Sequence, residues 1–374
     1  MKVVLLGTAH PFRGGLAAFN ERLINEFLKE GHEADIITFT TQYPSLLFPG
    51  STQFTDAPPP QHLKIKRMLS SVNPLTWWRT GRRLRRERPD ILIIKYWLPF
   101  MAPAFGTVAR MARGNGQTRV ICIADNIVPH EPRFYDKAFT RFFVNSCDGF
   151  ITMSNEVLRD LSGFNRTKLR AGNPHPLFDN FGKRTARQEA CATLQLDSSK
   201  KYILFFGFIR DYKGLDLLLE AMREVTAQLP EVELIVAGEF YTNAESYLQQ
   251  AAPLGAAIHW YDRFISDDEV STFFSVADLV VQPYKHATQS GVTQIAYHFE
   301  VPMVVTNVGG LPELVPDGEA GLVVPPQSDA IAAAIIRFFK EDMQPTLLAG
   351  LRAGKARFGW DRMVQTILQL RAKL

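Results

Sequence analysis

The 374-residue sequence predicts two consecutive α/β domains, each built on a doubly wound parallel sheet. Short apolar runs such as VVLLG and YILFFG alternate with segments whose apolar residues recur at helical spacing. Strands without polar–apolar alternation are typical of parallel sheets that helices cover on both faces. The chain is also too long for one ordinary core and suits two domains of roughly 150–200 residues.

The first half of the chain opens with a strand–helix–strand unit. VVLLG is the first strand, LAAFNERLINEFLKEGHE contains a helix that Gly31 ends, and ADIITFT is the second strand. Further buried strands are predicted at 91–96, 120–124 and 149–153. Residues 168–201 include RAGNPHPLFDNFGKRT, which has little apolar periodicity, and we interpret them as a linker or a domain edge.

The second half restarts the alternation and predicts a second domain. Its strands are YILFFG, VELIVAG, IHWYD, DLVVQPY, PMVVTN and LVVP, with helices expected at 215–229, 244–254, 267–276 and 292–299 and two more at the C-terminus. We expect an N-terminal domain over 1–180, a second domain over 181–358, and a helix at 359–374 that packs back on the first domain. Ligands of open α/β sheets bind beyond the carboxyl ends of the strands, and a cleft between two domains often holds a pocket.

Composition and charge exclude several classes of protein. Apolar residues make up 46% of the chain and charged residues 21%, which are globular values rather than those of a disordered chain. No apolar run approaches the about 18 residues of a membrane span, and MKVVLLGTAHP is too short for a signal peptide, so we expect a cytoplasmic protein. The three cysteines are widely spaced without a CxxC pair, so neither a disulfide framework nor a bound metal is expected.

The segment FFGFIRDYKGLDLLLEAM carries the strongest chemical pattern. A strand ends at Gly207, Arg210 and Lys213 follow in the loop, and Gly214 leads into an amphipathic helix. Two cations beside a helix N-terminus, at the carboxyl end of a strand, make an anion site with backbone N–H donors. The alternative is a solvated loop with two surface cations.

Two other loops have similar properties. In ATQSGVTQIAYHFEVP, Ser290 and Gly291 stand where a helix begins, so backbone amides there could hold a phosphate; the alternative is an ordinary capped helix start. The loop PFRGG, residues 11–15, follows the first strand without the GxGxxG spacing of a dinucleotide site, which disfavours an NAD enzyme. Its two glycines permit a tight turn against a ligand, or a purely structural turn.

These segments together resemble the large fourth family of nucleotide-sugar glycosyltransferases, which have the GT-B fold of two Rossmann-like domains facing across a cleft. The resemblance lies in GFIRDYKGLDLLLEA, VAGE, DLVVQPY, the SG loop and VPMVVTNVGGLPELVPDGEAGLVV, and in GGLAAFNERLINEFLKEGHEADIIT near the N-terminus. It implies transfer of a sugar from a nucleoside-diphosphate sugar with retention of configuration and no catalytic metal. No cofactor is then needed, because the nucleotide sugar is a co-substrate.

The resemblance also assigns roles to residues. Arg210 and Lys213 would hold the leaving diphosphate together with the amides of Ser290, Gly291 and Val292. The other donor contacts that it implies are Gly15, Gly207, Gly238, Glu239, Phe264 and Ile265, of which the last two would border the base. In the N-terminal domain, which binds the acceptor in this family, Arg13 and Asn126 are the expected acceptor contacts.

The sequence departs from the family pattern at two places. Typical members carry two glutamates, the second of which binds ribose, where this chain has Ala287 and Ile295; Gln289 and Gln294 are the nearest polar substitutes. Many members also place a histidine directly after the strand ICIA, where this chain has Asp125-Asn126. The histidine arrives later as His130, which could contact the sugar or take the proton of the incoming hydroxyl; a structural hydrogen bond is the alternative, and Asp125 is the rival for the polar role.

The segment LKIKRMLSSVNPLTWWRTGRRLRRERPD, which begins at residue 63, combines Trp77-Trp78 with a dense basic cluster. Nine Lys or Arg stand between Gln61 and Asp90 against two acids, on a chain whose net charge is only +4. Such a stretch can lie on an anionic membrane, so residues 64–88 are the expected docking surface of a peripheral enzyme with a glycan or lipid-linked acceptor. A solvated basic helix is the alternative; no nucleic-acid motif accompanies the cluster, so nucleic acid is not an expected partner.

Two other functions remain open from the sequence. A GT-B sugar-nucleotide epimerase would use the same donor, but such enzymes usually bring several acids and histidines to the cleft, and this chain has few. A two-domain sugar-binding protein of the periplasmic type would share the gross architecture, although the paired Arg210 and Lys213 and the absence of a signal peptide disfavour it.

Overall fold

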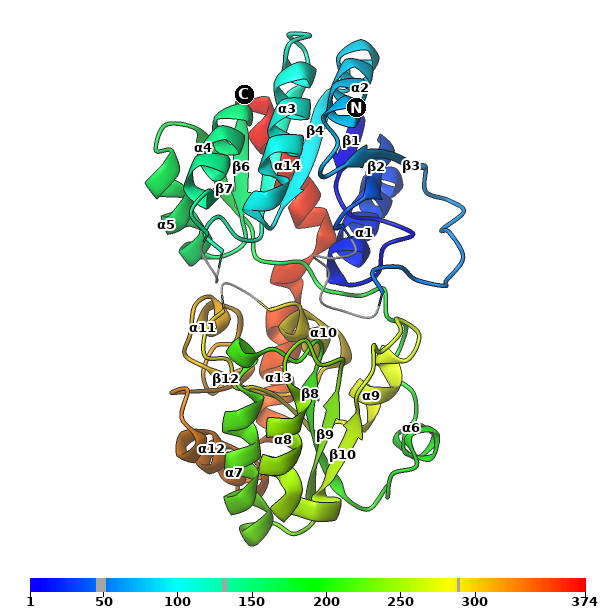
Figure 1. Cartoon of the computed structure of the whole chain (residues 1–374). Helices are drawn as coiled ribbons and strands as arrows, with labels where there is room; N and C mark the ends of the chain where they lie inside the picture. The colour runs from blue at the N-terminus through cyan, green and yellow to red at the C-terminus, as the bar shows by residue number, and fades with distance from the viewer. Residues whose placement is uncertain (45–51, 130–132, 288–289) are drawn as a thin grey trace. The chain divides into compact units, whose positions relative to one another are not determined.

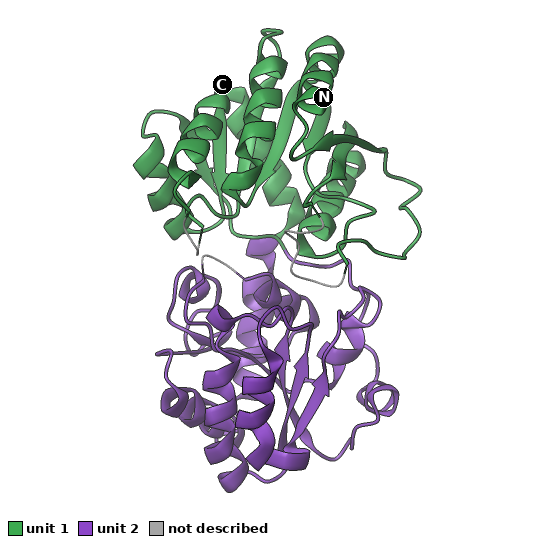
Figure 2. Ribbon diagram, viewed as in Figure 1, with its two compact units in different colours: residues 1–176, 359–374 green, residues 177–358 purple. Residues whose placement is uncertain are grey.

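The computed structural model describes residues 1–44, 52–129, 133–287 and 290–374. The chain forms two compact units, Met1–Pro176 with Gly359–Leu374 and Leu177–Phe358 (Figure 2). Each unit has its own parallel sheet and its own hydrophobic core. Within the described ranges, no helix combines the length and the apolarity that a membrane span requires.

Unit 1 is a seven-stranded parallel sheet in the order β3-β2-β1-β4-β5-β6-β7, covered by helices (Figure 1). The central strands are near-continuous apolar runs because both faces of the sheet are covered. The last helix comes from the far end of the sequence and packs on α1, where Trp360 meets Phe19 at a ring distance of 5.0 Å. The elements are β1 Lys2–Leu6, α1 Gly15–Lys29, β2 Glu33–Thr41, β3 Ile65–Ser70, α2 Pro74–Glu87, β4 Ile91–Tyr96, η2 Pro99–Met101, α3 Ala102–Arg113, β5 Arg119–Ala124, α4 Asp136–Ser146, β6 Gly149–Thr152, α5 Asn155–Phe164, β7 Leu169–Gly172 and α14 Trp360–Ala372.

Unit 2 is a six-stranded parallel sheet in the order β10-β9-β8-β11-β12-β13, again with helices packed against it (Figure 1). Its core joins the inner faces of α7 and α12 to the central strands. The elements are α6 Arg187–Leu194, β8 Lys201–Phe206, η3 Asp211–Lys213, α7 Leu215–Gln228, β9 Val232–Ala237, α8 Ala244–Ala251, η4 Ala252–Ala257, β10 Ile258–Tyr261, α9 Val270–Val276, β11 Leu279–Gln282, α10 Gly291–Phe299, β12 Met303–Thr306, α11 Leu311–Leu314, β13 Gly321–Val324, α12 Ser328–Lys340, α13 Gln344–Gly354 and η5 Lys355–Phe358. The prediction of two doubly wound parallel sheets is confirmed.

Each sheet has a point at which the strand order reverses. In unit 1 the reversal lies between β1 and β4, and in unit 2 between β8 and β11. The connections that leave two such strands diverge to opposite faces of the sheet, which opens a crevice at the carboxyl ends. The loops after β1, β4, β8 and β11 are therefore the places where ligand contacts are expected.

Two strands lie in segments where the sequence analysis expected none. β3 occupies the start of the basic segment and β7 the start of the stretch interpreted as a linker, which also contains α6. Both strands are edges of the seven-stranded sheet. Lys66 and Arg67 in β3 illustrate the reason, because edge strands carry charged, half-exposed residues that hide the apolar pattern.

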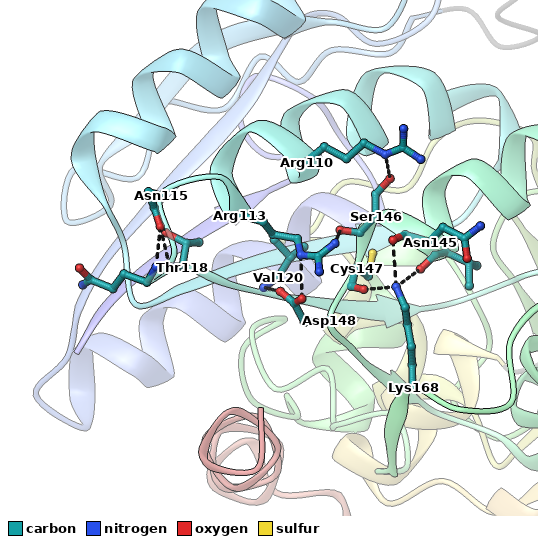
Figure 3. Close-up of polar contacts among 12 residues, drawn as sticks. Arg110, Arg113, Asn115, Thr118, Val120, Asn145, Ser146, Cys147, Asp148 and Lys168 are labelled. Atoms are coloured by element: carbon teal, nitrogen blue, oxygen red, sulfur yellow. Dashed lines mark hydrogen bonds and ion pairs between the residues drawn. The ribbon is translucent and has the colours of Figure 1, made fainter.

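Polar contacts at the amino edge of the unit 1 sheet fasten α3 and α4 to the strands (Figure 3). Asp148, directly before β6, accepts hydrogen bonds from the backbone N–H of Val120 and from Arg113 Nε at 2.8 Å and 2.7 Å. Lys168 Nζ donates to the last carbonyls of α4, including that of Cys147, so a cation satisfies the acceptors at the C-terminus of this helix. This edge is structural, and the carboxyl edge holds the candidate site.

Candidate active site

The loop after β8 is held against the loop after β11. From Gly207 (φ 91°) the chain runs through η3 to Gly214 (φ 69°), which begins α7. A Cβ on Gly214 would lie 2.0 Å from the carbonyl oxygen of Pro283, so only glycine permits both the backbone conformation and this close approach. A Cβ on Gly207 would lie 3.1 Å from Lys213 Nζ and 3.8 Å from Val292 Cγ2, which places the lysine and the start of α10 beside the end of β8.

The two expected cations lie in this loop in different settings. Lys213 is half-buried, and its partial burial together with the nearby positive charge of Arg210 lowers the pKa of Lys213 to about 7. Its Nζ lies 5.8 Å from the centre of the Tyr284 ring, and the Arg210 guanidinium lies 5.0 Å from that of Tyr241. Aromatic faces favour cations but do not neutralise them. In the part of the chain that the structure describes, no carboxylate contributes to the pKa of Lys213, so the site has an excess of positive charge.

Helix α10 begins beside these cations and lacks a side-chain cap. Ser290 is the N-cap in extended conformation, but its hydroxyl makes no cap hydrogen bond and lies 3.3 Å from the Tyr284 hydroxyl instead. The first N–H groups of the helix therefore receive no acceptor from the N-cap side chain, and the helix dipole adds partial positive charge there. Gly291 packs so closely on Phe178 that a Cβ would approach the ring to 2.8 Å. Lys213 and the start of α10 thus come together around Tyr284, which the sequence analysis did not select, and Arg210 lies near Lys213.

Gln294 lies one turn into α10 and is completely buried. Neither its amide nitrogen nor its amide oxygen has a hydrogen-bond partner within the described residues. The preceding Thr293, by contrast, donates to Gln282 Oε1 at 3.1 Å. Ala287 and Ile295, at the positions where the family carries glutamates, are buried apolar residues. Gln289 falls outside the described residues, so Gln294 is the polar substitute that the structure places here.

The carboxyl ends of β8, β9 and β10 carry an aromatic cluster. Phe208 stacks on Tyr241 at 4.5 Å with an interplanar angle of 28°, and Phe264 lies 6.2 Å from Phe208. All three rings are half-exposed, whereas Ile265 is buried. The sequence analysis selected Phe264 but missed Phe208 and Tyr241, because the stack joins loops from different strands.

Gly238 and Glu239 follow β9 and pack against the loop after β8. A Cβ on Gly238 would lie 2.2 Å from the Gly207 carbonyl oxygen. The carbonyl of Glu239 accepts a hydrogen bond from the backbone N–H of Ile209 at 2.9 Å. The two strand ends are therefore joined by backbone contacts, and Gly238 and Glu239 shortly precede Tyr241 of the aromatic cluster.

The cationic loop is braced by residues outside it. Asp211 Oδ1 accepts hydrogen bonds from Thr242 Oγ1 and from the Tyr247 hydroxyl, each at 2.9 Å. Lys285 pairs with Asp216 Oδ2 at 2.7 Å. The Asp211 contacts join η3 to α8 and to the loop before it, and the Lys285 pair joins the start of α7 to the segment after β11. The backbone N–H of Lys285 also donates to the carbonyl of Tyr212 in η3 at 2.7 Å, so the loop that carries the cations is held from two sides.

In unit 1, Asp125 directly follows β5 and its Oδ1 lies 2.7 Å from Nζ of Lys95, a residue of β4 that the sequence analysis passed over. Asn126 is half-buried beside it, and Gly15 is the first residue of α1. Arg13 precedes Gly15 in the loop after β1, where its backbone N–H donates to the carbonyl of Gln53. His130 lies outside the described residues.

Solved structures with this architecture align along the whole chain. The sucrose-phosphate synthase of Thermosynechococcus elongatus has a TM-score of 0.76 at 19% identity, with 100% of both chains covered. Anabaena HepE (Alr3699) in complex with UDP-glucose gives 0.74 at 17% identity, again covering 100% of both chains. A Listeria monocytogenes protein assigned as a UDP-N-acetylglucosamine 2-epimerase gives 0.65 at 13% identity, covering 100% of this chain and 97% of that one. These likenesses establish the fold, and the protein is a GT-B-fold protein.

Sequence comparisons give the family. The model described as Glycosyltransferase Family 4 matches residues 13–171, and that described as Glycosyl transferases group 1 matches residues 200–341. The chain therefore belongs to the group 1 glycosyltransferases of family 4.

Its curated relatives match it in part. The D-inositol 3-phosphate glycosyltransferase of Streptomyces avermitilis is 29% identical over 209 residues, 52% of this chain and 45% of the relative. Spore coat protein SA of Bacillus subtilis is 24% identical over 212 residues, 53% and 55% of the two chains. The chain spans about half the length of the curated relatives that it matches.

Proposed function

We propose that the protein is a retaining glycosyltransferase, which moves a sugar from a nucleoside-diphosphate sugar to a glycan or lipid-linked acceptor in the synthesis of cell-surface polysaccharide or lipopolysaccharide. One observation carries the proposal: the half-buried Lys213 lies beside Arg210 at the switch point of unit 2, without a carboxylate that balances the two charges among the residues described. Burying an unbalanced cation is costly unless a ligand supplies the opposite charge. A diphosphate supplies that charge.

In this proposal the cations act mainly on the leaving group. When the bond between the anomeric carbon and the diphosphate oxygen breaks, negative charge grows on the diphosphate. Lys213, Arg210 and the uncapped N–H groups at the start of α10 are fixed donors for that charge, and fixed donors need no reorganisation during the reaction. The reaction would therefore proceed without a metal, as the family resemblance implies, with retention of configuration.

The remaining donor contacts follow from the same edge of unit 2. The half-exposed rings of Phe208, Tyr241 and Phe264 offer an apolar wall for the base. Gly238 and Glu239 would lie along the nucleotide. Gln294, whose amide has no partner among the described residues, would hydrogen-bond the ribose or the sugar in place of the glutamate that the family carries.

The acceptor side is assigned to unit 1, with Asp125 and His130 as the polar groups nearest the reacting sugar and Arg13 and Asn126 as acceptor contacts; Gly15 is the contact of this unit with the donor. Asp125 stands at the carboxyl edge of the sheet and is the one of the two candidate bases that the structure describes. A peripheral position on the cytoplasmic face of the plasma membrane would bring this edge to a lipid-linked acceptor.

The structure sharpens which residues would touch such a membrane. Val72, Leu75 and Trp78 are exposed around the first turn of α2, and Arg82 lies 5.2 Å from the centre of the Trp78 ring. Trp77 is turned inward, packs on the core of unit 1 and donates its indole N–H to the carbonyl of Ser70 at 2.6 Å. The docking surface therefore depends on Trp78 and not on a pair of tryptophans. Exposed apolar side chains beside several arginines suit the interface of an anionic bilayer.

Co-sedimentation with vesicles tests this surface. Vesicles of phosphatidylglycerol and phosphatidylcholine at low salt should bind the wild-type protein, and Trp78→Ser should weaken binding severalfold, about 1–2 kcal/mol for one aromatic anchor. Leu248→Ser, which removes an exposed apolar residue of α8 in unit 2, is the matched control and should bind as the wild type does. Equal binding of the two variants would remove Trp78 from the surface, and no wild-type binding at low salt would overturn membrane docking.

A panel of UDP-, GDP- and ADP-sugars tests the activity. Release of nucleoside diphosphate, measured with and without membrane extracts that contain lipid-linked glycans, should appear with one donor class and increase with the extract. An epimerase would convert the sugar without the extract, and a sugar-binding protein would release nothing. A donor that binds should also raise the melting temperature, because it binds only the folded state.

A further inference from the structure

A buried ion pair occupies the switch point of unit 1. Lys95 is the last but one residue of β4, between strand residues that are all buried. The strand register places Lys95 opposite Ile123 of β5, and Asp125 lies two residues further along on the same face because side chains alternate. This arrangement brings Lys95 Nζ to 2.7 Å from Asp125 Oδ1.

The two side chains of this ion pair differ in how much of each is exposed to solvent. The Lys95 side chain is 2% exposed and that of Asp125 is 11% exposed. The ammonium therefore lies within the unit, and the carboxylate lies nearer the surface at the carboxyl edge of the sheet. The Phe19 ring covers the ammonium, with its centre 3.4 Å from Nζ, which adds a cation–π contact from α1.

The other titratable groups around Lys95 are neutral. His175, which follows β7, donates from Nδ1 to the carbonyl of Pro176 at 2.7 Å, and burial together with Lys95 lowers the pKa of His175 to about 3. Burial likewise raises the pKa of the Cys122 thiol on β5. Burial also lowers the pKa of Lys95, and Asp125 opposes that shift. Asp125 is thus the carboxylate that balances the buried ammonium.

Stability alone does not account for this pair. A buried ion pair contributes about as much as, or less than, apolar residues of the same volume, because both charges lose their hydration. Yet the lysine interrupts the otherwise apolar strand ILIIKY at the crevice of the sheet.

We propose that Lys95 is a positioning residue: its buried ammonium holds the Asp125 carboxylate in one orientation at the carboxyl edge, where the carboxylate accepts a hydrogen bond from a hydroxyl of the bound sugar. The inference rests on the proposed glycosyl transfer and deepens it. Lys95 itself does not touch the substrate, since Asp125 and Phe19 cover its ammonium.

The test compares Lys95→Met with Arg113→Met. Arg113 pairs with Asp148 at 2.7 Å in the same unit but at the amino edge of the sheet (Figure 3), so it controls for the loss of one cation from a partly buried pair. Turnover is measured as release of UDP from UDP-glucose, or with the nucleotide sugar that the panel selects. Lys95→Met should lower kcat at least about tenfold, a loss typical of removing a group that orients a functional side chain. Arg113→Met should keep the wild-type kcat at temperatures where both variants are folded.

A second readout separates positioning from general damage. The diphosphate is assigned to unit 2, so the rise in melting temperature with UDP, which carries no transferable sugar, should be unchanged in Lys95→Met. Lys95→Gln keeps a hydrogen-bond donor without the charge and decides the question if the methionine variant does not fold. Lys95→Arg, which restores the charge, should retain more turnover than Lys95→Gln.

Three results would overturn the inference: a wild-type kcat in Lys95→Met, equal losses in Lys95→Met and Arg113→Met, or a glutamine variant at least as active as the arginine variant. These results are distinct from a failure of the proposed function. In that case the wild-type protein itself would release no nucleoside diphosphate from any sugar of the panel.

Discussion

Both units place a lysine at the point where their strand order reverses, but the two lysines have opposite electrostatic surroundings. In unit 1, Lys95 is paired with Asp125 at 2.7 Å. In unit 2, Lys213 lies beside a second cation, Arg210, and beside the uncapped start of α10. The first lysine is balanced within its unit, whereas the second has no balancing carboxylate within the described residues.

The difference indicates which ligand each edge can accept. A balanced ion pair offers a neutral, polar surface, on which sugar hydroxyls find acceptors without a large change in charge. An unbalanced cationic site attracts an anion and pairs with it in a water-poor environment, where the interaction is strong. Under the proposed function, the same fold would serve two roles through charge balance rather than through strand arrangement.

Of the changes that test this comparison, replacing Lys213 is expected to have the largest effect on turnover. Lys213→Met should lower kcat about 10²–10³-fold, the loss seen when one fixed donor to a developing anion is removed. The free protein should become more stable, because burial and Arg210 lower the pKa of Lys213 in the folded state and so disfavour its charge. Steady-state kinetics and melting temperatures with and without UDP measure both effects.

Lys200→Met is the matched control for that experiment. Lys200 precedes β8 at the amino end of the same strand that Lys213 follows, and it pairs with Glu233 at 3.1 Å. Its removal should leave kcat unchanged and should not stabilise the free protein. A Lys213→Met enzyme with near-normal turnover would contradict the assigned role.

The pH dependence of donor binding gives the next largest effect. Below about pH 7, Lys213 is already charged in the free protein, and affinity should not depend on this group. Above its pKa of about 7, the lysine must take up a proton to pair with the diphosphate, so affinity should fall by up to about tenfold per pH unit. Titration calorimetry with UDP-glucose, whose esterified diphosphate does not titrate there, in two buffers of different ionisation enthalpy should show uptake of close to one proton at about pH 8.

The lowered pKa of Lys213 also determines whether the free protein becomes more or less stable as the pH rises. At Lys213 the unfolded chain binds more protons than the folded protein between about pH 7 and the ordinary lysine pKa of 10.5, so stability without donor should rise with pH over that window. In Lys213→Met this rise should disappear. Binding without proton uptake at about pH 8 would mean that the lysine remains charged in the free site.

The sequence predicted the buried strands and the cationic loop well, for a physical reason. Strands covered on both faces are continuous apolar runs, and a loop such as FIRDYKG between a strand and a helix carries its chemistry in adjacent residues. The strands β3 and β7 were not predicted because edge strands are partly exposed. These two contain the charged residues Lys66, Arg67 and Arg170. The pattern of apolar residues in a short segment therefore indicates whether the segment is buried, rather than whether it forms a strand.

Contacts between distant segments could not be predicted in the same way. Lys95 and Asp125 are 30 positions apart and meet only because β4 and β5 pair in one register. The stack of Phe208 on Tyr241 likewise joins the loops after β8 and β9. Trp77 and Trp78 look equivalent in sequence, but the geometry of α2 turns one inward and the other outward.

Replacing Gln294 is expected to have the smallest effect on stability and donor binding. This change tests whether the unit 2 site contacts the donor beyond its diphosphate. Its buried amide has no partner within the described residues, and such a group costs about 1–3 kcal/mol. Gln294→Leu should therefore stabilise the free protein by up to that amount. It should also weaken donor binding severalfold, about 1 kcal/mol for one neutral hydrogen bond.

Gln282→Leu is the control, because Gln282 faces the neighbouring Thr293 in a satisfied hydrogen bond of 3.1 Å. That change leaves the threonine hydroxyl unpaired, so it should destabilise the protein, in the opposite direction to Gln294→Leu. Melting temperatures of both variants and of the wild type, measured with and without UDP-glucose, give the comparison directly. If Gln294→Leu destabilises the protein or binds the donor as tightly as the wild type, the amide is not a donor contact. The specificity of this edge would then rest on its cations and its aromatic wall alone.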